Sequence, residues 1–276
     1  MKADLSFEVF PPKTNDGTEK IYSCLGALSS LSPSFISVTY SAGNAVGGKT
    51  SLVCGEIKNT YKTKAVSHLT CAGATKEKIK RELGELKRQN VDAILALRGD
   101  ITPQKPIGAY RHATDLMEEI IRCGEFELFG ACYPEGHAES GSIYDDLFSL
   151  KLKYDLGVRT FISQLFFDDD AFLRMADKAS AFCKGATFRA GIMPATSAKS
   201  VRRMVAMSNA TLPKKFVEIL DKYGADPLEM KKAGVDYAIG QIRNLYDEGC
   251  ENFHLYTMCM TDVTKEIYSG ISDLLR

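Results

Sequence analysis

The sequence has few of the features that mark membrane-spanning, nucleic-acid-binding or secreted proteins. No apolar run approaches the about 20 residues that cross a bilayer, so we expect no membrane segment. The 35 basic and 35 acidic residues give a formal net charge of +0 without blocks of like charge, so we expect no nucleic-acid surface. The first apolar run begins close to Met1, which predicts no signal peptide and a cytoplasmic location.

Disulfide and metal sites are not indicated either. The eight cysteines include no C-x-x-C pair, and a chain of 276 residues is far longer than a disulfide scaffold. Their spacings fit no zinc site, and no pair of carboxylates lies near a third ligand. We therefore expect reduced, mostly buried thiols and no bound metal.

Apolar strands alternate with helical segments along the whole chain. Most of the strands are continuous apolar runs, as in parallel strands covered on both faces. Their spacing is about 30 residues, as in a barrel of about 250 residues with eight strands. This pattern predicts an α/β fold, a TIM (β/α)8 barrel, with residues 1–276 as a single catalytic domain. The predicted strands are Leu5–Phe10, Phe35–Tyr40, Ala65–Cys71, Ala93–Leu97, Glu127–Tyr133, Thr160–Leu165, Phe188–Ile192 and Asn252–Thr257.

Helix signals fill the intervals between the strands. Thr75 is an N-cap candidate for a helix over Ile79–Gln89, and Gly124 is the expected end of Ala113–Cys123. The interval before the last strand is long enough for an extra helix. An open doubly wound sheet is the competing fold, but no G-x-G-x-x-G follows the first strand. The remaining predicted helices are Phe172–Cys183, Ser197–Met207, Pro213–Tyr223, Asp226–Glu248 and Asp262–Leu275.

Reactive side chains gather where the predicted strands end. Glu8 lies inside the apolar run Ser6–Pro12, where a charge is costly unless it is paired, solvated or used in chemistry. The C-terminal strand ends form the active site of a TIM barrel, so we expect a ligand pocket there. Ser140-Gly141-Ser142 at a helix start is a weak phosphate signal. The other polar residues at strand ends are Thr39, Tyr40, His68, Arg98, Asp100, Tyr133, His137, Gln164 and His254.

Structural roles are the alternative for several of these residues. Glu8 could be one partner of a buried ion pair, and Arg98 with Asp100 could form a salt bridge at a turn. His68 could be a hydrogen-bonded core histidine. The position of His254 inside a strand favours a structural role.

Taken in order, the strand-end motifs resemble those of the methylenetetrahydrofolate reductase family. The resemblance runs from the first predicted strand to the last and covers nearly the whole chain, as in the short bacterial form without a regulatory domain. The motifs are SFEVFPP, VTY at Val38–Tyr40, HLTC at His68–Cys71, LRGD at Leu97–Asp100, YPEGH at Tyr133–His137, QLFFD at Gln164–Asp168, GIMP at Gly191–Pro194 and HLYT at His254–Thr257.

This resemblance implies an activity and a cofactor. The family holds non-covalent FAD in a TIM barrel and reduces 5,10-methylenetetrahydrofolate to 5-methyltetrahydrofolate, with NADH or NADPH as the donor in a ping-pong scheme. The resemblance implies that Glu8 is the general acid and that Asp100 lies beside the flavin and stabilises the folate cation. Burial between Phe7 and Phe10 would raise the pKa of Glu8, as an acid requires.

The family's binding residues can be placed on this chain position by position. Gln164 matches a glutamine that contacts folate and nicotinamide, and Ser200 stands where some relatives have a substrate-contacting glutamine. The implied flavin contacts are Thr39, Tyr40, His68, Arg98, Gly99, Asp100, Ala113, Tyr133, His137, Asp146, Ser149 and Lys153.

Two departures from the family pattern leave the electron donor open. Met260 stands where many relatives have a folate-binding arginine, and Leu152 where the flavin helix often has one; Lys151 or Lys153 could replace the latter charge. The alternative function is a flavin subunit of an electron-transfer assembly that takes electrons from a partner protein. We also expect a homo-oligomer. A flavin-free methyltransferase or aldolase-type barrel is a third interpretation, but no lysine lies at a strand end for a Schiff base.

Overall fold

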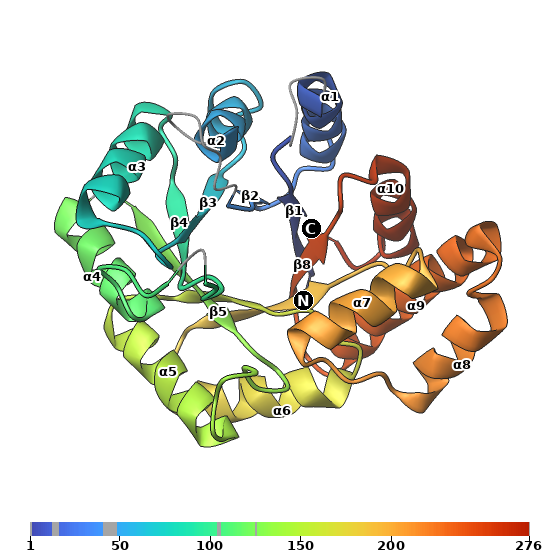
Figure 1. Ribbon diagram of the computed structural model, residues 1–276. Helices are drawn as coiled ribbons and strands as arrows, with labels where there is room; N and C mark the ends of the chain where they lie inside the picture. Colours follow the sequence, from blue (N-terminus) through green and yellow to red (C-terminus); the bar gives the residue numbers. More distant parts are fainter. Residues whose placement is uncertain (1, 13–16, 41–48, 104–105, 125, 276) are drawn as a thin grey trace. The chain divides into compact units, whose positions relative to one another are not determined.

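The computed structural model describes residues 2–12, 17–40, 49–103, 106–124 and 126–275 of the chain (Figure 1). Eight parallel strands follow one another in chain order and close into a barrel, which confirms the predicted TIM (β/α)8 fold. The open doubly wound sheet is wrong, because a closed strand order leaves no sheet edge. The strands are β1 (Asp4–Val9), β2 (Ile36–Val38), β3 (Ala65–Thr70), β4 (Ala93–Leu97), β5 (Glu127–Cys132), β6 (Thr160–Ser163), β7 (Thr187–Ile192) and β8 (Asn252–Tyr256).

Ten helices lie between and after these strands in the described part of the chain. The interval from β7 to β8 contains three of them, so the additional helical segment predicted before the last strand is present. The helices are α1 (Gly17–Ser29), α2 (Lys49–Asn59), α3 (Lys76–Arg88), α4 (Ala113–Cys123), α5 (Ile143–Asp155), α6 (Asp169–Ser180), α7 (Ala198–Ser208), α8 (Lys214–Tyr223), α9 (Pro227–Asp247) and α10 (Thr261–Gly270). Within the described residues, no helix combines the length and apolar character needed to cross a membrane.

Local sequence chemistry sets several helix ends. Thr75 caps α3 by accepting a hydrogen bond from the Lys78 backbone N–H. Gly124 ends α4 in the left-handed conformation, at φ 71°, which glycine adopts without a Cβ penalty. The predicted last helix is too long: α10 ends at Gly270. The following turn leads to Leu275, which bridges Ala3 and so ties the end of the chain to its beginning.

The chain divides into two compact units, which we call the N-terminal and C-terminal units. The N-terminal unit contains Ser6–Ala131 and Leu152–Thr160, and the C-terminal unit contains Met1–Leu5, Cys132–Lys151 and Phe161–Arg276. Each unit is described by itself. That residues 1–276 form a single domain stays a prediction.

In the N-terminal unit, helices cover one face of the strands. Helix α2 packs against β2 and β3, and α4 packs against β4 (Figure 1). Residue pairs in register are Phe7 with Ile36 and Glu8 with Ser37. Since partners in register share a face and neighbours along a strand alternate, Glu8 and Ser37 point away from the face that carries Phe7 and Ile36.

The C-terminal unit has an aromatic core beneath its extra helices. Phe167, which follows β6, stacks on Phe216 of α8 with ring centroids 4.5 Å apart. Tyr237 of α9 contacts Phe216 and donates a hydrogen bond to the Phe167 carbonyl at 2.7 Å. This core holds the segment that follows β6 and Gln164 in place.

Candidate active site

Glu8 is a carboxyl group buried in β1. Glu8 is 6% exposed and stands between Phe7 and Val9, which are both fully buried. Burial raises the pKa of Glu8 from 4.5 to about 8, because a carboxylate loses its hydration in an apolar setting. Glu8 therefore keeps its proton at neutral pH, which is the form that a general acid requires.

His68 of β3 lies beside Glu8. The His68 Nε2 atom is 3.5 Å from Glu8 Oε2, and both side chains are 8% exposed. Burial lowers the pKa of His68 to about 4, so the imidazole is neutral at pH 7. The two groups thus meet as neutral partners, and the interpretation of Glu8 as half of a buried ion pair does not hold with His68.

The turn after β4 carries three predicted residues, Arg98, Gly99 and Asp100. The Arg98 carbonyl accepts backbone hydrogen bonds from Cys71 and Ala72, which hold the turn against the end of β3. Gly99 has φ +80°, and a Cβ at this position would lie 3.0 Å from the Thr70 Cβ. Glycine is therefore required here by conformation and by space.

The two charged side chains of this turn differ in exposure. Arg98 Nε donates to the Gly99 carbonyl at 3.2 Å, so the guanidinium folds over its own turn. Asp100 is exposed. A carboxylate at the end of a barrel strand can pair with a cationic ligand.

The other predicted flavin contacts of the N-terminal unit are held by specific hydrogen bonds. Thr39 follows β2, and its carbonyl accepts from the Thr50 hydroxyl at 3.0 Å. Tyr40 donates to Glu82 of α3 at 2.8 Å, and burial together with this carboxylate raises the pKa of the phenol. Lys153 of α5 is 7% exposed and donates from Nζ to the Ala131 carbonyl at 2.8 Å. Ala113 is the first residue of α4 and is half-buried.

In the C-terminal unit, Asp146 organises the loop between β5 and α5. This buried carboxylate accepts from the His137 backbone N–H at 2.9 Å and from the Ser140 hydroxyl at 2.8 Å. Gly136 in the same loop has φ +87°, and a Cβ there would lie 3.3 Å from Asp146 Oδ2. The rings of Tyr133 and His137 meet edge to face with centroids 4.8 Å apart. The predicted loop residues Tyr133, His137 and Asp146 thus form one contact set.

The remaining predicted residues lie on other elements of this unit. Gln164 directly follows β6; its backbone N–H donates to the Cys132 carbonyl at 2.8 Å, and its side-chain amide oxygen accepts from the Leu165 N–H at 2.9 Å. Ser149 is half-buried on α5, and Ser200 is exposed in the first turn of α7. His254 is fully buried in β8 against Tyr256, which agrees with a structural role.

The turn that departs from the family pattern is unusual in conformation. Met258 and Cys259 follow β8 with φ of 50° and 56°, a region that side-chain-bearing residues adopt rarely. Met260 then accepts a weak hydrogen bond at its Sδ atom from the Thr196 hydroxyl at 3.7 Å. No disulfide bond joins the eight cysteines in the described part of the chain, and five of them are buried.

Three residues that support the site were not predicted from the sequence. They are either uncharged or lie far along the chain from the residue that they support. Ser37 lies opposite Glu8 in the register of β1 and β2, and Thr70 leaves little space for a side chain at position 99. Glu82 accepts a hydrogen bond from the Tyr40 hydroxyl. The small size of Ser37 in an apolar strand was a weak signal. Nothing local to Glu82 distinguishes it from the other acidic residues of α3.

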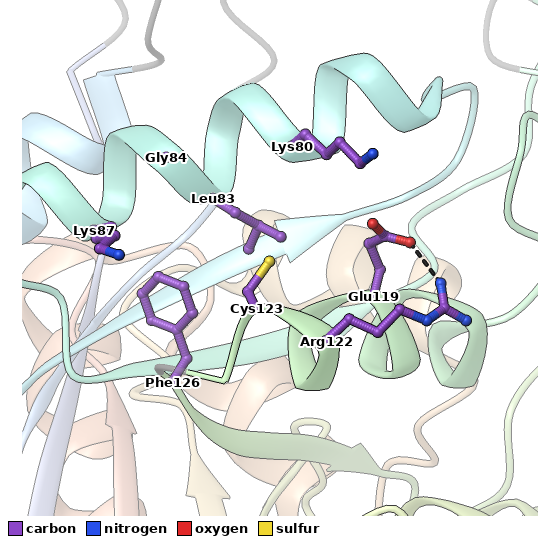
Figure 2. Close-up of a pocket in the computed structure, with 8 residues that line it drawn as sticks. All are labelled: Lys80, Leu83, Gly84, Lys87, Glu119, Arg122, Cys123 and Phe126. Carbon is purple, nitrogen blue, oxygen red and sulfur yellow. Dashed lines mark hydrogen bonds and ion pairs between the residues drawn. The ribbon is translucent and has the colours of Figure 1, made fainter.

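A separate groove of about 520 Å³ opens between α3 and α4 (Figure 2). Figure 2 shows Leu83, Cys123 and Phe126 facing one another, with Glu119 bound to Arg122 beside them. The predicted site residues do not line this groove, and its one buried acid, Glu119, is already paired. We therefore assign the chemistry to the strand ends and not to this groove.

A buried, protonated acid beside a neutral histidine, on strands of a closed parallel barrel, is typical of a (β/α)8-barrel enzyme. Solved structures support the fold alone: ligand-free tryptophan synthase from M. tuberculosis aligns with TM-score 0.55 and 9% identity over 98% of this chain and 93% of that chain. The methylenetetrahydrofolate reductase family model matches residues 1–272.

Individual relatives give the same result. A 5,10-methylenetetrahydrofolate reductase from Pectobacterium carotovorum is 33% identical over 96% of this chain and 89% of its own length. The reductase from Escherichia coli is 31% identical over the same shares. A relative from Arabidopsis thaliana, named methylenetetrahydrofolate reductase (NADH) 1, is 30% identical over 92% of this chain and 45% of its own. The chain belongs to the methylenetetrahydrofolate reductase family and is an oxidoreductase.

Proposed function

We propose that this enzyme reduces 5,10-methylenetetrahydrofolate to 5-methyltetrahydrofolate with FAD as its cofactor, and that Glu8 is the general acid. The observation that carries the proposal is the buried Glu8 carboxyl, whose pKa of about 8 keeps it protonated at neutral pH. Membership of the family supports the substrate.

The residues present suit FAD. Gly99 and Gly136 hold positive φ values in two strand-end loops, so the loop backbone can approach a ligand where side chains would obstruct it. His68 Nε2 is buried and has no hydrogen-bond partner in the described part of the chain, as expected for an atom that serves a ligand or a reacting group. Bound FAD would supply the hydride that the folate receives.

We assign flavin binding to the residues that match the family pattern. In the N-terminal unit these are Thr39, Tyr40, His68, Arg98, Gly99, Asp100, Ala113 and Lys153. In the C-terminal unit they are Tyr133, His137, Asp146 and Ser149. Asp146 and Lys153 already bond to protein groups, so their contribution is to hold the loop and strand in shape.

Side chains of the protein supply the proton and the charge that the reaction needs. Glu8 holds a proton until the five-membered ring of the folate opens, and donates it to the departing nitrogen as the iminium forms. Asp100 then offers its negative charge to the folate cation. Gln164 and Ser200 are assigned to substrate binding. We also propose a cytoplasmic location and a homo-oligomeric state.

NADH or NADPH is the proposed electron donor, and the NADH in the name of the Arabidopsis relative supports this choice. A partner protein that delivers electrons is the second candidate. It is favoured by Met260 and by Leu152, which is 41% exposed, because these residues replace the arginines expected at two binding positions.

Glu8→Gln tests the proposed function. We expect it to slow folate reduction by at least about 100-fold, because glutamine has no proton to donate, while reduction of the flavin by the donor continues. Stopped-flow absorbance of the flavin measures both half-reactions. Glu118→Gln, a change of the same type on the exposed face of α4, is the control and should keep both rates. Loss of both half-reactions in a folded, flavin-loaded Glu8→Gln protein would remove Glu8 from the acid role.

A further inference from the structure

Glu8 and His68 reach each other across an intervening strand. β1 and β3 are both paired with β2, and strands lie about 4.8 Å apart, so the two backbones are about 10 Å apart. Ser37 of β2 is in register with Glu8, and Val66, two residues before His68, is in register with Ser37. The small Ser37 side chain leaves room above β2, and the two longer side chains lean together there to 3.5 Å.

The protonation states limit what this contact can be. Burial keeps Glu8 protonated and His68 neutral at pH 7, since their pKa values are about 8 and about 4. One of the two groups must therefore donate to the other for His68 Nε2 to be satisfied. The separation of 3.5 Å shortens to a hydrogen bond with a side-chain movement of about 0.5 Å.

We propose that His68 is a positioning residue for Glu8: its Nε2–H donates to Glu8 Oε2 and thereby fixes the acidic proton on Oε1. This inference rests on the proposed role of Glu8 as the acid. If Oε2 instead carried the proton and donated it to Nε2, the proton would point at the imidazole and could not reach a substrate. When the proton leaves Oε1, the Nε2–H···Oε2 bond becomes charge-assisted and stabilises the buried carboxylate.

Few other charged groups are positioned to take over this role. β2 and β4, the neighbours of β3, carry no titratable side chain within Ile36–Val38 and Ala93–Leu97. Arg98 and Asp100 follow β4 in the next turn. In the strand order, β8 is the other neighbour of β1 and carries His254 and Tyr256.

A pair of His68 variants separates positioning from simple packing. His68→Leu removes the donor at similar volume, and His68→Gln keeps an amide N–H near the position of Nε2. We expect His68→Leu to slow folate reduction about 100-fold, the usual effect of losing one donor to a developing charge, and His68→Gln to recover at least about tenfold of that loss. The rate of flavin reduction by the donor and the flavin affinity, measured by fluorescence, report any effect on cofactor binding. Equal folate-reduction rates in the two variants would overturn the proposal.

Spectroscopy gives a readout that does not depend on turnover. ¹⁵N NMR of the four histidines in the wild-type protein should show His68 protonated at Nε2 and unprotonated at Nδ1. Infrared difference spectra against Glu8→Gln should show a carboxyl band that shifts to higher frequency in His68→Leu as its hydrogen bond is lost. An unprotonated Nε2, or an unmoved band, would refute the contact. If Glu8→Gln retained folate reduction while both spectra behaved as expected, the proposed acid role would fail and the His68–Glu8 contact would stand.

Discussion

At the scale of single residues, burial sets the chemistry of this protein. Glu8 and His68 are ordinary titratable groups whose pKa values move in opposite directions, because desolvation disfavours the charged form of each. The result is a neutral acid beside a neutral base at physiological pH. An acid of this kind can protonate a leaving nitrogen and be reprotonated without a large change in pH.

The same pKa shift predicts how stability depends on pH. Unfolded Glu8 titrates near 4.5 and folded Glu8 near 8, so the folded state binds more protons in that window. The stability that Glu8 contributes is complete below pH 4.5 and is lost as the pH rises to 8. His68 acts in the opposite sense: its contribution is present above pH 6.5 and is lost as the pH falls to about 4. Of these two contributions, that of Glu8 changes most between pH 6.5 and 8.

We therefore expect the free energy of unfolding of the wild type, relative to that of Glu8→Gln, to fall between pH 6.5 and 8. The expected fall is on the order of 1–2 kcal/mol, at about 1.4 kcal/mol for each pH unit over which the folded state holds the extra proton. Urea denaturation at the two pH values measures it. Glu118→Gln should follow the wild type. A parallel course of wild type and Glu8→Gln would mean that Glu8 is already ionised in the folded protein.

At the scale of elements, two strand-end segments are held by carboxylates on helices of the barrel. Asp146 in the first turns of α5 holds the loop of His137 and Ser140, and Glu82 of α3 holds Tyr40. A helix is rigid, so a loop tied to it keeps its ligand-facing atoms in place at little entropic cost on binding.

Asp146→Ala tests this anchoring. Two hydrogen bonds to a buried carboxylate are lost, so we expect the free energy of unfolding to fall by about 1–3 kcal/mol. The affinity for FAD should fall by about tenfold as the loop becomes less ordered. Denaturation and flavin fluorescence measure the two effects. The neighbouring Asp145→Ala, at an exposed position, should change stability by less than about 0.5 kcal/mol. Unchanged FAD affinity in Asp146→Ala would show that the loop does not serve the cofactor.

At the scale of the whole molecule, the source of electrons is the main functional question. The chain covers 89% of the length of two bacterial relatives named 5,10-methylenetetrahydrofolate reductase. The turn after β8 nevertheless has Met260 in place of an expected arginine, next to two residues in left-handed conformation. We infer that the loss of this charge weakens folate binding at the turn.

Mixing the oxidised, flavin-loaded enzyme with NADH or NADPH distinguishes the two candidate donors from a partner protein. We expect at least one nicotinamide to bleach the flavin in stopped-flow measurements faster than steady-state turnover, because Glu8, His68 and the loop of Asp146 are all retained. Failure of both nicotinamides would favour an electron-delivering partner.

Met260→Arg tests the turn after β8. It should strengthen folate binding, because a guanidinium adds charge-assisted hydrogen bonds.

The sequence alone determined the strands, several helix limits and the family. Continuous apolar runs predict buried parallel strands, and Thr75 and Gly124 act through bonds within a few residues, so local chemistry is sufficient for them. Only the tertiary structure decided that Glu8 meets His68 over Ser37, that Glu82 holds Tyr40 and that Asp146 holds the loop before α5. These contacts join residues distant in the chain, and the pKa values of Glu8 and His68 depend on the burial that closure of the strands creates.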